Sequence, residues 1–112
     1  MTEPPDVSLG ELQQKVLDFA RDRDWLRFHN PRHVAEAILV EAGELLECFL
    51  WRSDEDCVVD RLDQARRGAV EAELADVLIY ALNLANALEV DAAQVILTKL
   101  RSNADKYPAT ET

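Results

Sequence analysis

Residues 69–88 have the sequence AVEAELADVLIYALNLANAL. At about 100° per residue, its apolar side chains are spread around almost the whole circumference of a helix, a pattern typical of a helix with neighbours on every side. The chain has 112 residues, enough for one domain but hardly enough to surround such a helix. We therefore expect an all-α four-helix bundle that is completed by a second subunit.

Two helices are predicted before this stretch. Apolar residues recur at steps of three and four from about residue 9 to residue 24, and Ser8 and Glu11 can form a capping box at the start. An aromatic loop follows and ends at Asn30, after which a second helix is predicted to run from residue 31 or 32 to residue 51. No segment shows the alternating pattern of a strand.

The third helical region is predicted to consist of two parts. Gly68 divides a short amphipathic piece around residues 58–65 from the main helix, which begins near Ala69. Asp91 is then expected to cap a fourth helix that ends near Lys106.

Composition excludes several classes of protein. The chain has 12 Lys and Arg against 22 Asp and Glu, a net charge of −10, which disfavours partners such as nucleic acid or an anionic membrane. Its three glycines stand alone, so neither a P-loop nor a dinucleotide-binding fingerprint can be assembled. No secretory signal is recognisable, so a cytoplasmic location with Cys48 and Cys57 as free thiols is expected. We expect a flexible lead at 1–8, one domain at 9–108 and a tail at 109–112.

Acidic residues recur at steps of three in two of the predicted helices. The motif EAGELLE contains Glu41, Glu44 and Glu47, and the motif ELAD places Glu73 and Asp76 in the most hydrophobic part of the chain. Like charges so spaced repel, more strongly when partly buried. Acids at i and i+3 on two facing helices could converge on Mg²⁺ or Mn²⁺. The alternative is a solvated acidic face with Glu73 and Asp76 paired to Arg or Lys.

Two further groups of residues have both a functional and a structural interpretation. The cations Lys99, Arg101 and Lys106 could bind phosphates or could simply complement the dipole at a helix C-terminus. The aromatic residues could stack on a nucleobase or belong to the core; they are Trp25, Phe28, Trp51 and Tyr80.

The motifs EAGELLE, ELAD and KLRSNADKYP together resemble the MazG-like, all-α nucleoside triphosphate pyrophosphohydrolases. The likeness covers about residues 9–108, and the segment RDWLRFHNPRH is most similar to the dCTP pyrophosphatase branch. The resemblance implies a homo-dimer or homo-tetramer that hydrolyses the α–β phosphoanhydride of a nucleoside triphosphate, giving the monophosphate and pyrophosphate. Mg²⁺ is the implied cofactor, and Mn²⁺ can substitute for it.

The resemblance also implies roles for particular residues. The metal ligands would be Glu41, Glu44, Glu73 and Asp76, and either Glu44 or Glu47 would act as the general base. The nucleotide pocket and the phosphate-binding residues would be Trp25, Phe28, His29, Trp51, Tyr80, Lys99, Asn103, Lys106 and Tyr107.

One position departs from the dCTP pyrophosphatase pattern. Val16 stands where vertebrate-type members of that branch have a histidine that approaches the base, so the sequence leaves the base preference open. Two other functions are compatible with the residues: a non-catalytic helical module that binds Mg²⁺ and nucleotides, and a purely structural acidic bundle.

Overall fold

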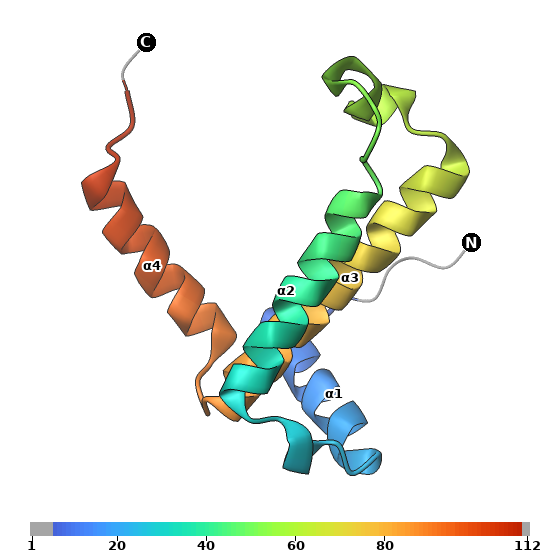
Figure 1. Ribbon diagram of the computed structural model, residues 1–112. Coiled ribbons are helices and arrows are strands. Elements are labelled where there is room, and N and C mark those ends of the chain that lie inside the picture. The colour runs from blue at the N-terminus through green and yellow to red at the C-terminus, as the bar shows by residue number, and fades with distance from the viewer. Residues whose placement is uncertain (1–5, 111–112) are drawn as a thin grey trace.

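The computed structural model describes residues 6–110 and consists mainly of four α-helices (Figure 1). Helix α1 spans Leu9–Asp22, α2 spans Pro31–Glu47, α3 spans Gln64–Ala87 and α4 spans Ala92–Lys106. Between residues 6 and 110 there is no β-strand, which confirms the all-α prediction. The predicted lead and tail fall partly on residues 1–5 and 111–112, which lie outside the described residues.

Local side-chain caps explain where most of these helices begin. The Ser8 hydroxyl accepts a hydrogen bond from the Glu11 N–H at 3.1 Å, and the Glu11 carboxylate accepts one from the Ser8 N–H, so the capping box is confirmed. Asn30 caps α2 by accepting a single hydrogen bond from the Arg32 N–H at 2.9 Å, with Pro31 in the first turn. Asp91 caps α4 as predicted.

The segment between α2 and α3 differs from the prediction. Helix α2 ends at Glu47, four residues before Trp51, and residues 54–61 form two short 3₁₀ helices instead of an amphipathic helical piece. Gly68 does not divide α3, because Asp63 caps the helix earlier by accepting a hydrogen bond from the Arg66 N–H at 2.8 Å. A single helical glycine costs only about 1 kcal/mol, which a favourable cap offsets.

Helices α2 and α3 form an antiparallel hairpin, with α1 packed across α3 near its C-terminal end (Figure 1). The guanidinium of Arg66, in the first turn of α3, donates a hydrogen bond to the carbonyl of Cys48 at the end of α2. The buried apolar residues are small: Ala20, Val34, Ala85 and Ala92. Small side chains let the helices approach closely but bury little apolar area.

The single chain leaves much of its apolar surface uncovered. Its accessible surface is 9177 Å², whereas a compact monomer of 12.6 kDa exposes about 6,200 Å². Its radius of gyration is 17.1 Å, against about 13 Å for a compact domain of this length. Helix α3 was predicted to have neighbours on every side, but it lacks them on the side of Leu74 and Leu78, which are exposed.

Between residues 6 and 110, no helix is both long and apolar enough to cross a membrane.

Candidate metal and nucleotide site

Three carboxylates converge between α2 and α3. Glu41 of α2, together with Glu73 and Asp76 of α3, offers oxygens that all lie within 4.8 Å of one another. Glu73 and Asp76 share one face of α3 because they are three residues apart, and the hairpin brings α2 against that face. The Oε2 atoms of Glu41 and Glu73 are buried and have no hydrogen-bond partner.

Within residues 6–110, no cation pairs with this cluster. The ion pairs of the described residues are all between neighbours on one helix or turn, such as Arg67 with Glu71, and none includes Glu41, Glu73 or Asp76. The pairing with Arg or Lys that the sequence left open is therefore absent from residues 6–110.

Burial and nearby acids raise the pKa values of Glu41 and Glu73. Loss of solvation, followed by the neighbouring charge of Glu44, raises the pKa of Glu41 to about 7. The same two causes, with the charge of Asp76 contributing, raise the pKa of Glu73. Glu44 is itself exposed but lies close enough to act on both residues, whereas Glu47 affects neither pKa.

This arrangement fits a hard divalent cation. Unpartnered carboxylate oxygens on two facing helices are the ligand type that Mg²⁺ and Mn²⁺ prefer. A bound cation would also offset the repulsion that the raised pKa values report.

A pocket of about 540 Å³ adjoins the acidic cluster, and Asp76 lines it. This volume lies within the usual range for small-molecule sites. Three predicted substrate-binding residues line it, namely Trp25, His29 and Tyr80. The remaining lining residues are Leu12, Lys15, Val16, Phe19, Ala20, Ile79 and Asn83. The pocket is thus largely apolar, and Asp76 connects it to the acidic cluster.

The end of α1 places Trp25 in this pocket. Asp24 adopts a left-handed conformation, with φ of 57°, and the N–H of Trp25 donates to the carbonyl of Ala20 at 2.9 Å. The N–H of Asp24 also donates to the carbonyl of Arg21, and the two hydrogen bonds form a Schellman motif. In this motif the residue after the turn packs back on the helix. The Trp25 ring accordingly meets the Phe19 ring edge-on, with centroids 5.7 Å apart.

The other predicted substrate-binding residues do not line the pocket in one chain. They are Phe28, Trp51, Lys99, Asn103, Lys106 and Tyr107. Trp51 is 99% exposed and has a left-handed φ of 65°. The last four belong to α4 and its C-cap, and α4 diverges from the α2–α3 hairpin (Figure 1).

Lys15 and Asn83 also line the pocket, although neither was among the predicted site residues. Asn83 is 7% exposed and its Oδ1 has no hydrogen-bond partner. Its position three residues after Tyr80, on the same face of α3, is the signal that could have identified it. Lys15 carries no comparable signal, because it lies beside the apolar face of α1 and not within it.

The chain is similar to known proteins over nearly all of its length. It is 38% identical to mouse dCTP pyrophosphatase 1 over 104 residues, which are 93% of this chain. It is 37% identical to human dCTP pyrophosphatase 1 over 105 residues, which are 94% of this chain. The chain spans only 61% and 62% of the length of these two relatives. The crystal structure of a pyrophosphatase from Archaeoglobus fulgidus superposes on this chain with a TM-score of 0.80, at 35% identity. The superposition covers 97% of this chain and all of the archaeal chain. A sequence model described as the MazG-like family matches residues 37–112. The chain belongs to the MazG-like family.

Proposed function

We propose that this chain is a Mg²⁺-dependent nucleoside triphosphate pyrophosphohydrolase, with dCTP or modified dCTP among its substrates and Mn²⁺ able to replace Mg²⁺. It hydrolyses the α–β phosphoanhydride, releasing the nucleoside monophosphate and pyrophosphate, and so removes unwanted nucleotides from the cytoplasmic pool. The similarity to dCTP pyrophosphatases and to an archaeal pyrophosphatase supports this reaction class.

One observation carries the proposal: the carboxylate cluster and the aromatic pocket share Asp76. A triphosphate that places its base between Trp25 and Tyr80 would extend its phosphates towards the acids. Acids alone would repel it, so the cation that the cluster fits is needed for the phosphates to approach.

Glu41, Glu44, Glu73 and Asp76 would hold the metal. When bound, Mg²⁺ supplies positive charge to the phosphate oxygens and lowers the pKa of a bound water. We assign the proton-accepting role to Glu44, as a carboxylate that is not fully used in holding the metal. Its charge acts on Glu41 and Glu73 while the side chain stays exposed, so it lies at the cluster and has room for a water molecule. Glu47 has no such link to the cluster.

The pocket supports a nucleobase as the group recognised beside the metal. Trp25 and Tyr80 offer ring faces, while His29 and Asn83 offer polar atoms for the edge of the base. Val16 adds an apolar wall at the position where related enzymes have histidine. A pyrimidine fits this combination, and the valine favours tolerance of substituents on the ring.

We further propose that the active form is a homo-dimer or homo-tetramer. The surface in excess of a compact monomer, about 3,000 Å², is larger than the roughly 800 Å² that each partner buries in a standard interface. Helix α4 diverges from the α2–α3 hairpin, so its residues that are expected near the phosphates do not line the pocket of their own chain; they are Lys99, Asn103 and Lys106. In an assembly, the pocket of a second copy would be the site that these residues reach.

Glu73→Ala is predicted to lower pyrophosphate release from dCTP by about 100-fold or more, because it removes a ligand of the essential cation. Helix content, measured by circular dichroism, should stay unchanged. Glu71→Ala is the matched control: Glu71 lies on the same helix, is exposed, and pairs only with Arg67 at 3.8 Å. Binding of dCTP without formation of the monophosphate by the wild-type protein would favour the non-catalytic module instead.

Glu44→Gln is predicted to reduce turnover by about 100-fold or more at saturating Mg²⁺, because an amide cannot accept the proton of the attacking water. Glu47→Gln, one turn along α2, should retain most of the wild-type turnover. The turnover of both variants is measured as the steady-state rate of pyrophosphate release. Equal losses in the two variants would contradict the assignment of the base to Glu44.

The metal-free protein is predicted to become less stable as the pH rises from 5.5 to 8. The folded-state pKa of Glu41, about 7, lies above its ordinary value, so the protonated form favours folding and this contribution is lost as the pH rises through 7. Melting temperatures in EDTA should fall over this range, and Mg²⁺ should raise them more at pH 8 than at pH 5.5.

Glu41→Gln should flatten that pH dependence, because the amide does not ionise. Glu36→Gln provides the control, since Glu36 is exposed on the same helix and pairs with Arg32. If Mg²⁺ raised the melting temperature by the same amount at pH 5.5 and pH 8, this would argue against the idea that Mg²⁺ displaces a proton from Glu41.

Sedimentation equilibrium is expected to give two or four times the chain mass of 12.6 kDa. Leu78→Glu places a charge on the uncovered face of α3 and should shift the distribution towards smaller species. A wild-type protein that sediments as a monomer at micromolar concentration, yet hydrolyses dCTP at full rate, would contradict the proposed assembly.

A further inference from the structure

Helix α4 is attached to the rest of the chain mainly at its first turn. Ala92 is buried there, and most of the following residues of the helix are exposed. The turn that precedes α4 contains Glu89 in a left-handed conformation, with φ of 57°, and closes a Schellman motif at the end of α3 through a bond from the Val90 N–H to Ala85. The direction of α4 therefore depends on what holds this turn.

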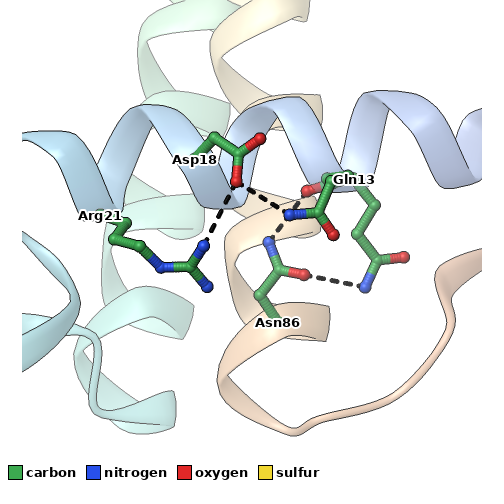
Figure 2. A network of polar contacts seen from close by, with 5 residues as sticks. Gln13, Asp18, Arg21 and Asn86 are labelled. Carbon is green, nitrogen blue, oxygen red and sulfur yellow. Dashed lines mark hydrogen bonds and ion pairs between the residues drawn. The ribbon is translucent and has the colours of Figure 1, made fainter.

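The side chain of Gln13, from α1, holds the turn at three points. Its Nε2 donates to Asn86 Oδ1 at 3.0 Å and to the Val90 carbonyl at 2.8 Å, while its Oε1 accepts from the Ala92 N–H at 2.9 Å. Asn86 completes the contact by donating from Nδ2 to the Gln13 carbonyl at 3.2 Å. Figure 2 shows Gln13 and Asn86 facing each other between α1 and the end of α3.

These four hydrogen bonds connect the end of α3, the turn and the start of α4 to a single residue. Both N–H groups of the Gln13 amide are used and its oxygen is engaged, so the amide has one orientation that satisfies all partners. The other polar contacts of α1 in this region do not reach the turn. Arg21 bonds to Asp18 of the same helix (Figure 2). Gln14 also bonds to Asp18, at 2.8 Å.

A small rotation at this turn would have a large effect at the other end of α4. The 15 residues of the helix span about 22 Å, so a change of about 20° at its start moves its end by about 8 Å. Lys106, in the last turn, would leave the reach of any phosphate that it contacts in the correct orientation.

We propose that Gln13 and Asn86 are positioning residues that fix the direction of α4 and thereby place its basic end for phosphate binding. The orienting role rests on the hydrogen bonds at the turn, whereas the consequence for catalysis rests on the proposed function. Neither residue touches the acidic cluster or lines the adjoining pocket. Their effect should therefore appear in the affinity for the substrate more than in the affinity for Mg²⁺.

The test compares Gln13→Leu with Gln14→Leu. Gln14 is its neighbour on α1 and bonds only to Asp18, so Gln14→Leu removes a glutamine without touching the turn. Gln13→Glu is the second variant: it keeps the acceptor for the Ala92 N–H but loses both donors, and it guards against a folding failure of Gln13→Leu. Circular dichroism establishes which variants are folded.

Two measurements are made on each folded variant. The first is the distribution of distances between a spin label on α1 and one on α4. The labels are attached at Asp22→Cys and Ser102→Cys in a chain whose own cysteines are removed by Cys48→Ser and Cys57→Ser. Labelled chains are diluted with unlabelled ones so that only distances within one chain are measured. We expect this distribution to broaden or shift in the Gln13 variants only. The second is steady-state hydrolysis of dCTP, in which KM should rise by about tenfold with a smaller change in kcat. The Mg²⁺-induced shift in melting temperature should stay at the wild-type value.

Each outcome decides a separate point. An unchanged distance distribution in both Gln13 variants overturns the positioning role. A broadened distribution with an unchanged KM overturns its link to phosphate binding. If the wild-type protein does not hydrolyse dCTP, the proposed function fails for that substrate, while the distance measurement still decides whether Gln13 and Asn86 orient α4.

Discussion

The close approach of Glu41 to Glu73 and Asp76 across the α2–α3 interface is the constraint on which the rest of this structure depends. Three acids within 4.8 Å oppose the packing of the two helices, and the raised pKa values of Glu41 and Glu73 express that opposition. The hairpin holds them together through its packing and through Arg66, which links the two helices at the loop end. A fold that places like charges together in this way is stabilised when a proton or a cation binds to them. Folding is therefore coupled to the binding of a proton or a cation at this cluster.

The parts of this arrangement that are local in sequence could be predicted. Ser8, Asn30 and Asp91 cap helices through atoms two or three residues away, and these starts were predicted correctly. The i, i+3 spacing of Glu73 and Asp76 places both on one helix face whatever the tertiary structure. The prediction that Gly68 divides the third helical region was wrong, because Asp63 caps the helix five residues earlier and the helix tolerates the glycine at modest cost.

The parts that depend on distant contacts or on unusual backbone could not be predicted. Asp24 and Glu89 take left-handed conformations, which glycine adopts most readily. Aspartate tolerates this region better than most residues, but the side chain of Glu89 gives no such indication. The position of Trp25 against Phe19 follows from the first of these turns, and the direction of α4 from the second. The bond between Gln13 and Asn86 joins residues 73 positions apart, so no local pattern contains it. The sequence therefore predicted candidate site residues but not which of them one chain brings together.

The distribution of charge gives the separation of α4 from the pocket a physical meaning. The net charge of −10 includes an acidic cluster on the α2–α3 hairpin, while Lys99, Arg101 and Lys106 lie on an arm that diverges from it. Had these cations folded back on the acids of their own chain, they would have neutralised the cluster and competed with a divalent cation for it. By keeping them apart, the chain preserves an unneutralised acidic cluster and leaves its cations unpaired with it. Under the proposed function, a nucleoside triphosphate with its metal is the ligand that needs both, because its phosphates attract the cations and its metal attracts the acids.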